Sequence, residues 1–194
     1  VVGPDGTAHA LGLGLPGRAV AANAAMAVAA ASTLGVPVPA ALERCRTVRQ
    51  VDGRYLDRQV DGRQVRLLLA KNPAGWLEVL ENVDSTRGTV VLALNARTAD
   101  GTDPSWLWDV PFERLAGRQV LVCGERREDV GVRLAYADVP HTLHDSVEAA
   151  ARAADLLPGD DQVDVVANYT AFRDLLRRLE PAGVPAPSRA EPVR

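Results

Sequence analysis

The chain has 194 residues, of which 47% are apolar and 24% charged, a composition typical of a folded globular protein. Its net charge of -3 disfavours nucleic acid as the main partner, because phosphate binding needs a basic surface. The two cysteines, Cys45 and Cys123, belong to no Cys-x-x-Cys pair, so we expect neither a disulfide framework nor a structural zinc site. The longest apolar stretch, residues 19–31, is too short to span a membrane, and the simplest location is the cytoplasm.

Residues 1–64 form the first predicted segment. The chain starts with Val-Val-Gly rather than Met, so we expect a piece of a longer protein. A turn signal over residues 4–6 precedes an Ala-rich helix over residues 18–34 and a short helix over residues 39–46. This segment has too few strands for a core of its own, which indicates the end of a larger domain.

Residues 65–180 alternate between apolar strands and amphipathic helices. This order predicts an α/β domain with a mainly parallel, Rossmann-like sheet and helices on both faces. We expect Asp145 to cap the third of its helices and Asn168 to cap the last. Residues 181–194 contain four prolines and predict a disordered tail. The predicted strands are 65–70, 89–94, 119–123, 141–143 and 162–167, and the predicted helices are 73–82, 125–137, 145–157 and 170–179.

Ligands of parallel α/β sheets bind at the carboxyl ends of the strands, and Lys71 directly follows the first of these strands. Lys71 is the single lysine among 22 basic residues, which favours a site that needs a compact ammonium. Together with Asn72 at a helix start, it predicts an anion or phosphate site. The alternative is a leftover surface lysine beside a turn in which Asn72 is only the helix N-cap.

The loop after the second strand, residues 95–109, is unusually long and contains two of the three tryptophans. Pro104 favours an extended conformation for Asp103, which would direct its carboxylate outward. Trp106 and Trp108 offer the large apolar area that is common at protein interfaces. The alternative is that the tryptophans cover the end of the sheet and the aspartates cap turns. The chain contains neither of the common glycine-rich phosphate-binding motifs.

Four stretches, residues 69–75, 99–109, 124–126 and 168–170, together resemble the C-terminal domain of the MurT family. MurT proteins are the Mur-ligase-like subunits of lipid II isoglutaminyl synthase. Residues 65–180 correspond to the Mur ligase C-terminal domain of this type. Residues 1–64 resemble the end of the Mur ligase central domain, in which Asn23 and Arg54 would lie near the nucleotide.

The resemblance implies a reaction that uses ATP with Mg²⁺ to activate the α-carboxylate of D-glutamate in lipid II. The GatD glutamine amidotransferase subunit would supply ammonia, which gives D-isoglutamine during peptidoglycan synthesis at the inner face of the cell membrane. Asp103 would complete the Cys-His pair of GatD, and Lys71 would lie close to the transferred phosphate.

Other residues receive supporting roles from the same resemblance. Asn23, Arg54 and Asn72 would bind the nucleotide, and Trp106 and Trp108 would contact GatD. Typical family members carry a zinc ribbon, whose ligands this chain lacks. Two alternatives stay open: a piece of another ATP-dependent Mur or folylpolyglutamate-type ligase, and a non-catalytic interaction module.

Overall fold

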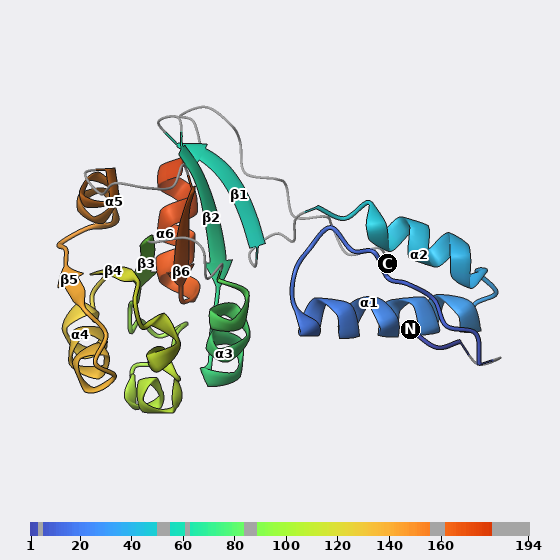
Figure 1. The fold of residues 1–194 in the computed structure, drawn as a ribbon, viewed down its shortest axis with the longest axis horizontal. Helices are drawn as coiled ribbons and strands as arrows, with labels where there is room; N and C mark the ends of the chain where they lie inside the picture. Colours follow the sequence, from blue (N-terminus) through green and yellow to red (C-terminus); the bar gives the residue numbers. More distant parts are fainter. Residues whose placement is uncertain (4–5, 50–54, 61–62, 84–88, 156–161, 180–194) are drawn as a thin grey trace.

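The computed structural model describes residues 1–3, 6–49, 55–60, 63–83, 89–155 and 162–179. Within these ranges two helices come first, followed by six strands interspersed with four further helices and two short 3-10 helices (Figure 1). The elements are α1 Arg18–Thr33, α2 Val38–Arg46, β1 Tyr55–Val60, β2 Arg63–Leu69, α3 Pro73–Asn82, β3 Thr89–Ala93, η1 Ser105–Asp109, η2 Phe112–Leu115, β4 Gln119–Cys123, α4 Arg127–Tyr136, β5 His141–Leu143, α5 Val147–Asp155, β6 Gln162–Ala167 and α6 Tyr169–Leu179.

The six strands form one sheet in the order β1-β2-β6-β3-β4-β5, in which only the β1–β2 pair is antiparallel. Helices α3 and α4, with η1 and η2, pack on one face through residues such as Trp76, Phe112 and Leu134. Helices α5 and α6 pack on the other face through Ala150 and Phe172. The α/β fold with a mainly parallel sheet and helices on both faces is therefore confirmed.

The apolar runs of the central strands follow from burial on both faces. Val90 and Leu92 of β3 face the α3–α4 layer, whereas Val91 and Ala93 face the α5–α6 layer. Because successive side chains of a strand point to opposite faces, a strand covered on both sides needs an unbroken apolar run. This is why β3 and β4 could be located from the sequence to within one residue.

The sheet starts at Tyr55, inside the segment that we assigned to residues 1–64. Strand β1 lies at the edge of the sheet and pairs with β2 over its whole length. Its Leu56 is buried, whereas Asp57 and Arg58 are exposed. An edge strand of this kind lacks the apolar run by which we recognised the central strands, so the sequence analysis placed the start of the sheet too late.

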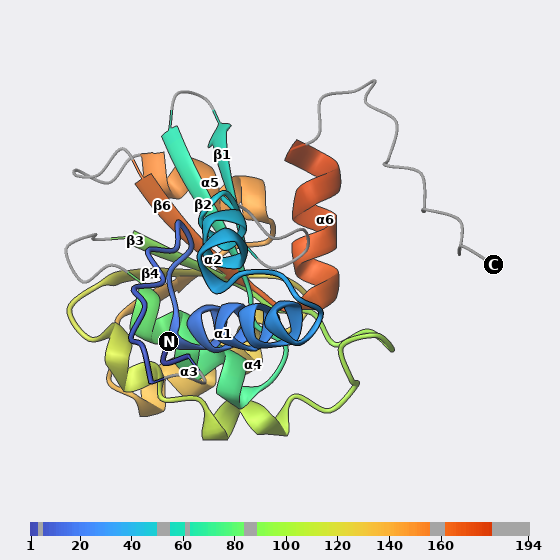
Figure 2. The same ribbon diagram turned by 90° about the vertical axis from the view of Figure 1, so that its right-hand side faces the viewer.

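Helices α1 and α2 lie side by side next to the α/β domain (Figures 1 and 2). They pack on each other through Val28, Ala41 and Leu42. The Ala19 amide of α1 donates a hydrogen bond to Glu78 of α3 at 2.7 Å. Among the described residues, no helix is both long enough and apolar enough to cross a bilayer. The predicted disordered tail, residues 181–194, lies outside the described residues.

A buried ion pair joins β2 to β6 on the α3–α4 face of the sheet. The Arg66 guanidinium donates through Nε to Asp164 Oδ1 and through Nη2 to Asp164 Oδ2, both at 2.6 Å. The Asp164 side chain is completely buried, and that of Arg66 is 11% exposed. Nη2 of Arg66 also donates to the carbonyl oxygen of Asn82 at 3.3 Å, which ties α3 to the same pair.

Cys123 ends β4 with its thiol fully buried, 3.6 Å from the carbonyl oxygen of Leu92 to which it donates. Burial raises the pKa of this thiol to about 12, well above that of a free cysteine. We therefore expect a thiol reagent at pH 8 to modify the half-buried Cys45 and to leave Cys123 unmodified until the protein is unfolded. Mass spectrometry of the labelled chain tests this, and equal labelling of both cysteines in the native state would contradict it.

The raised pKa of the Cys123 thiol also makes the stability of the folded protein fall as the pH rises. The Cys123 thiol ionises near its ordinary pKa in the unfolded chain but only near pH 12 in the folded one, so the folded state holds its proton longer. The contribution of this thiol to the unfolding free energy is complete at pH values below its pKa in the unfolded chain. It is lost as the pH rises above that pKa, by up to about 1.4 kcal/mol per pH unit. Compared with a Cys123→Ala variant, the wild-type protein should lose more unfolding free energy between pH 8 and 10.

Candidate functional site

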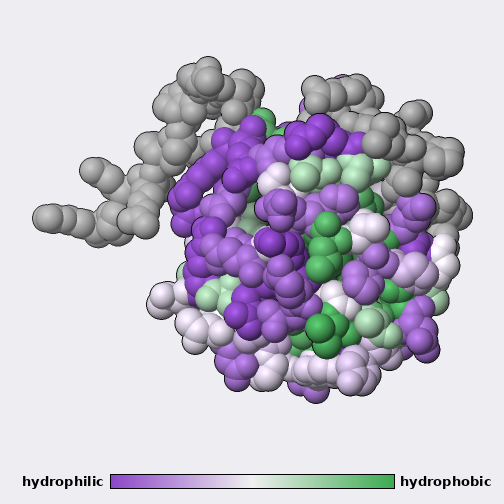
Figure 3. Space-filling view, turned by 90° about the vertical axis from the view of Figure 1, so that its left-hand side faces the viewer, coloured by the Kyte–Doolittle hydropathy of each residue, from purple (hydrophilic) through white to green (hydrophobic). Residues whose placement is uncertain are grey.

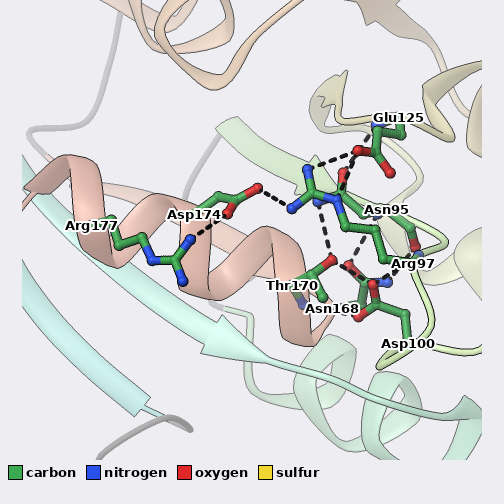
Figure 4. Close-up of polar contacts among 8 residues, drawn as sticks. All are labelled: Asn95, Arg97, Asp100, Glu125, Asn168, Thr170, Asp174 and Arg177. Carbon is green, nitrogen blue, oxygen red and sulfur yellow. Dashed lines mark hydrogen bonds and ion pairs between the residues drawn. The ribbon is translucent and has the colours of Figure 1, made fainter.

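Two asparagines hold together the loops at the carboxyl edge of the sheet (Figure 4). Asn95 lies two residues after the end of β3, Asn168 directly follows β6, and both are buried. The Asn168 side chain accepts from the Asn95 amide at 3.1 Å and donates to the Asn95 carbonyl at 2.6 Å. The Asn95 side chain in turn accepts from the Glu125 amide at 3.0 Å, and this hydrogen bond connects the loop after β4 to the two asparagines. The expectation that Asn168 caps the last helix is wrong, because its side chain is committed to Asn95.

Asp100 takes the place of that cap from a different loop. Its Oδ1 accepts from the Thr170 amide in the first turn of α6 at 2.9 Å, and its Oδ2 accepts from the Thr170 hydroxyl. The Arg97 amide also donates to Oδ2, at 3.2 Å. The long loop after β3 is therefore anchored to the start of α6. The cap expected from Asp145 is also wrong, since α5 begins with the Ser146 hydroxyl accepting from the Ala149 amide at 3.1 Å.

Arg97 braces the same region from the solvent side. Its guanidinium contacts the carboxylates of Glu125 at 2.7 Å and Asp174 at 2.8 Å. The hydrogen bond to Glu125, and after it the one to Asp174, raise the pKa of Arg97 above its ordinary value. Because two carboxylates already neutralise it, Arg97 serves to connect the β3 loop, the β4 loop and α6 rather than to attract an anion.

Asp103 lies three residues beyond this anchor with its carboxylate exposed to solvent. Its Oδ1 accepts from the Ser105 amide at 2.8 Å, and this hydrogen bond holds the pKa of the carboxyl below its usual value. The side chain is therefore ionised, oriented by its own loop and accessible from outside. A shallow cavity of about 250 Å³ lies beside it, lined by Asp103, Pro104, Ser105, Leu107, Trp108, Asp129 and Val132.

The two tryptophans of this loop have different environments. Trp106 is half-buried and packs against the buried Trp76, with 6.3 Å between the ring centroids. Trp108 is 54% exposed and makes an edge-to-face contact with Tyr136, with 5.2 Å between the ring centroids. The face of the domain on which α4 and β5 lie is mainly hydrophilic, with separate hydrophobic areas (Figure 3). Trp108 is thus available to a partner, whereas Trp106 chiefly belongs to the core.

Lys71 lies at the carboxyl end of β2 with its side chain exposed. Its ammonium lies 4.7 Å from the centroid of the Tyr169 ring, a cation–π contact between the β2 and β6 loops. Asn72 is the N-cap of α3 and accepts from the Gly75 amide at 2.9 Å. The structure thus brings Lys71 to the rim of the sheet, and it commits Asn72 to the local turn.

The two residues of the first segment that we expected near a nucleotide are not both described. Asn23 is exposed on α1 and lines a cavity of about 510 Å³, whose lining includes neither Lys71 nor Asn72. Arg54 lies outside the described residues. Over the described part of the chain, no group of three or more His, Cys, Asp or Glu side chains is arranged to hold a metal ion.

The contacts that join the site were not predicted from the sequence. They are the pairing of Asp100 with Thr170 and the position of Tyr169 beneath Lys71. A partial signal was present, because positions 95 and 168 are asparagines within two residues of the ends of buried strands. The pairs themselves connect residues that are far apart in the chain, and only the order of the strands brings them together.

Comparison with known proteins places this site in a family. The family model described as MurT ligase C-terminal matches residues 69–172, which include Lys71, Asp103 and the start of α6. The subunit MurT of lipid II isoglutaminyl synthase (glutamine-hydrolyzing) from Staphylococcus aureus is 31% identical over 137 residues. The corresponding subunit from Streptococcus pneumoniae is 29% identical over 164 residues. The matches cover 66% and 79% of this chain but only 30% and 37% of the relatives, so the chain spans about a third of their length.

Solved structures show the same fold at low sequence identity. Folylpolyglutamate synthase from Thermotoga maritima has a TM-score of 0.60 at 16% identity, covering 90% of this chain and 42% of that protein. The D-alanyl-D-alanyl-adding Mur ligase from Acinetobacter baumannii has a TM-score of 0.61 at 16% identity, covering 86% of this chain and 37% of that protein. The fold is that of the Mur ligases, and the family model covers more than half of the chain; the chain therefore belongs to the MurT ligase C-terminal family.

Proposed function

We propose that this chain presents Asp103 to the glutamine-hydrolysing subunit of a lipid II isoglutaminyl synthase. The partner would be a GatD glutamine amidotransferase, and the assembled enzyme would convert the D-glutamate of lipid II to D-isoglutamine in peptidoglycan synthesis. The observation that carries the proposal is the Asp103 carboxylate, which is exposed, oriented by Ser105 and held at a pKa below its usual value. The family match includes this loop.

The chemistry of Asp103 follows from its charge and position. A glutaminase cysteine needs a neighbouring imidazole to take its proton, and that imidazole needs an acceptor for its second N–H. An ionised carboxylate orients the ring and stabilises the imidazolium that forms when the thiolate attacks glutamine. The amide of Ser105 donates to Oδ1 of Asp103 and the Ser105 hydroxyl also contacts the carboxylate, which stays exposed to an approaching partner.

Lys71 would serve the ATP-dependent half of the reaction. ATP supplies the phosphoryl group that activates the D-glutamate carboxylate. The exposed ammonium of Lys71 at the rim of the sheet fits a phosphate, because it offers a compact positive charge near the start of α3. We assign Mg²⁺ to no residue of this chain. Lipid II would bring the enzyme to the inner face of the membrane.

Mixing the purified chain with the amidotransferase subunit tests the proposal. We expect the chain to form a complex with that subunit and to raise its glutamate release at least about 10-fold, since it completes the catalytic set. Formation of a complex without any gain in hydrolysis would favour a non-catalytic interaction module. Failure to bind at all would favour a ligase that needs no amidotransferase.

The two tryptophans provide a matched pair of variants for the docking surface. Trp108→Ala should weaken binding of the amidotransferase about 10-fold or more with little loss of stability, since the ring is exposed beside Asp103. Trp106→Ala should instead lower the unfolding free energy by about 2 kcal/mol, because it removes packing against Trp76. Calorimetric titration and urea unfolding measure the two effects. Unchanged binding by the Trp108 variant would remove this residue from the interface.

A further inference from the structure

Two adjacent residues at the start of α6 contact the two loops to which we assign the chemistry. The Tyr169 ring lies beneath the ammonium of Lys71, in the loop after β2. Thr170 donates its amide and its hydroxyl to Asp100, in the loop that carries Asp103. The β2 and β3 loops do not follow strands that pair with each other, because β6 lies between β2 and β3 in the sheet. The helix that follows this middle strand therefore reaches both loops.

We propose that Tyr169 and Thr170 are positioning residues, Tyr169 for Lys71 and Thr170 for Asp103. This inference rests on the proposed function and extends it to residues that contact neither ATP nor the partner directly. One helix end would thereby fix the separation between the ammonium of the ligase half and the carboxylate of the glutaminase half.

Tyr169 suits its part because its ring is itself held. The ring is half-buried, and its hydroxyl accepts from Arg173 Nη1 at 3.4 Å, one turn further along α6. The Arg173 guanidinium carbon also lies 5.8 Å from the ring centroid. A lysine side chain has a flexible four-carbon stem and adopts many conformations when it is unrestrained. Attraction to a fixed aromatic face confines the Lys71 ammonium to the rim of the sheet.

Thr170 suits its part because it makes two hydrogen bonds to one carboxylate. Asp100 accepts from the amide and the hydroxyl of Thr170 with different oxygens, and Oδ2 also accepts from the Arg97 amide. The chain then turns at Gly101, whose φ of +85° suits glycine, and reaches Asp103 two residues later. The start of the loop is therefore fixed to α6, so the short segment that carries Asp103 begins at a defined position.

The test uses the full-length subunit assembled with its amidotransferase and compares two activities of each variant. The first is glutamine hydrolysis. The second is ATP-dependent amidation of lipid II driven by ammonium chloride, which bypasses the partner. Thr170→Val should lower the ratio of hydrolysis to ammonia-driven amidation about 10-fold, because it loses the hydroxyl bond to Asp100. Tyr169→Leu should raise this ratio about 10-fold through a lower kcat of amidation.

Conservative variants separate positioning from simple loss of stability. Thr170→Ser keeps the hydroxyl and Tyr169→Phe keeps the aromatic face, so both should retain the wild-type ratio within about threefold. Ratios that stay at the wild-type value for Thr170→Val and Tyr169→Leu would overturn the inference, even if both activities fall together.

Variants of the two assigned residues show which proposal fails. If Lys71→Ala leaves ammonia-driven amidation unchanged, or Asp103→Ala leaves hydrolysis unchanged, the proposed function itself is wrong. If those two variants lose activity while Tyr169→Leu and Thr170→Val leave the ratio unaltered, only the positioning roles are wrong.

Discussion

Replacing Asp103 with asparagine should lower glutamine hydrolysis by the assembled enzyme at least about 100-fold. The Asn side chain can still accept from the Ser105 amide, so the loop keeps its conformation, and the exposed position makes a loss of stability small. What the variant lacks is the negative charge that stabilises the partner's imidazolium. Glutamate release at saturating concentrations of both subunits measures the effect.

Asp109 provides a matched control for this variant. It is an exposed aspartate of the same loop, so Asp109→Asn removes the same charge from a nearby position. We expect it to change hydrolysis by less than about threefold, in line with the small effects of ordinary surface substitutions. Hydrolysis by Asp103→Asn at a rate equal to that of this control would refute the assigned role.

Removing one partner of the buried Arg66–Asp164 pair should cost about 3–5 kcal/mol of unfolding free energy, because an uncompensated charge then stays inside the domain. In Asp164→Ala the Arg66 guanidinium would keep its 3.3 Å hydrogen bond to the Asn82 carbonyl and its contact with the Tyr55 hydroxyl, neither of which supplies a compensating carboxylate. Urea unfolding followed by tryptophan fluorescence measures the loss. The size of the effect follows from the two 2.6 Å hydrogen bonds and from the complete burial of the Asp164 side chain.

Two further variants show whether the loss of unfolding free energy in Asp164→Ala comes from an unpaired buried charge. The double variant Arg66→Met/Asp164→Leu removes both charges and should recover most of the stability. Buried ion pairs often contribute no more to folding stability than apolar side chains of similar volume do. Glu81→Ala breaks the exposed pair with Arg114, whose side chains are 37% and 45% exposed, and should cost less than about 1 kcal/mol. A cost of less than about 1 kcal/mol for Asp164→Ala would show that Arg66 readily finds water or another partner.

The sequence predicted the sheet best where burial leaves the clearest pattern. Strands β3 and β4 carry apolar runs because both of their faces are covered, and the bounds of β3, β4 and β6 agree with the structure to within one residue. Strand β1 was missed because its buried Leu56 is followed by exposed polar and charged residues at the edge of the sheet. Edge strands therefore need pairing information that a single sequence does not contain.

The site shows the same division between local and long-range information. The exposure of Asp103 could be predicted from the Pro104 that follows it. The distinction between Trp106 and Trp108 could not, because both lie in one 3-10 helix, where residues two apart point in different directions. The cap of α6 was assigned to Asn168, the nearest residue in sequence, whereas the structure uses Asp100, 70 residues before Thr170.

The most direct measurement is a structure of the chain bound to the glutamine-hydrolysing subunit. The account predicts that a carboxylate oxygen of Asp103 lies about 2.6–3.2 Å from a ring nitrogen of the partner's catalytic histidine. It also predicts that Trp108 is covered by the partner, while Trp106 stays packed against Trp76. A complex in which Asp103 faces solvent, or in which the partner supplies its own carboxylate to that histidine, would contradict it.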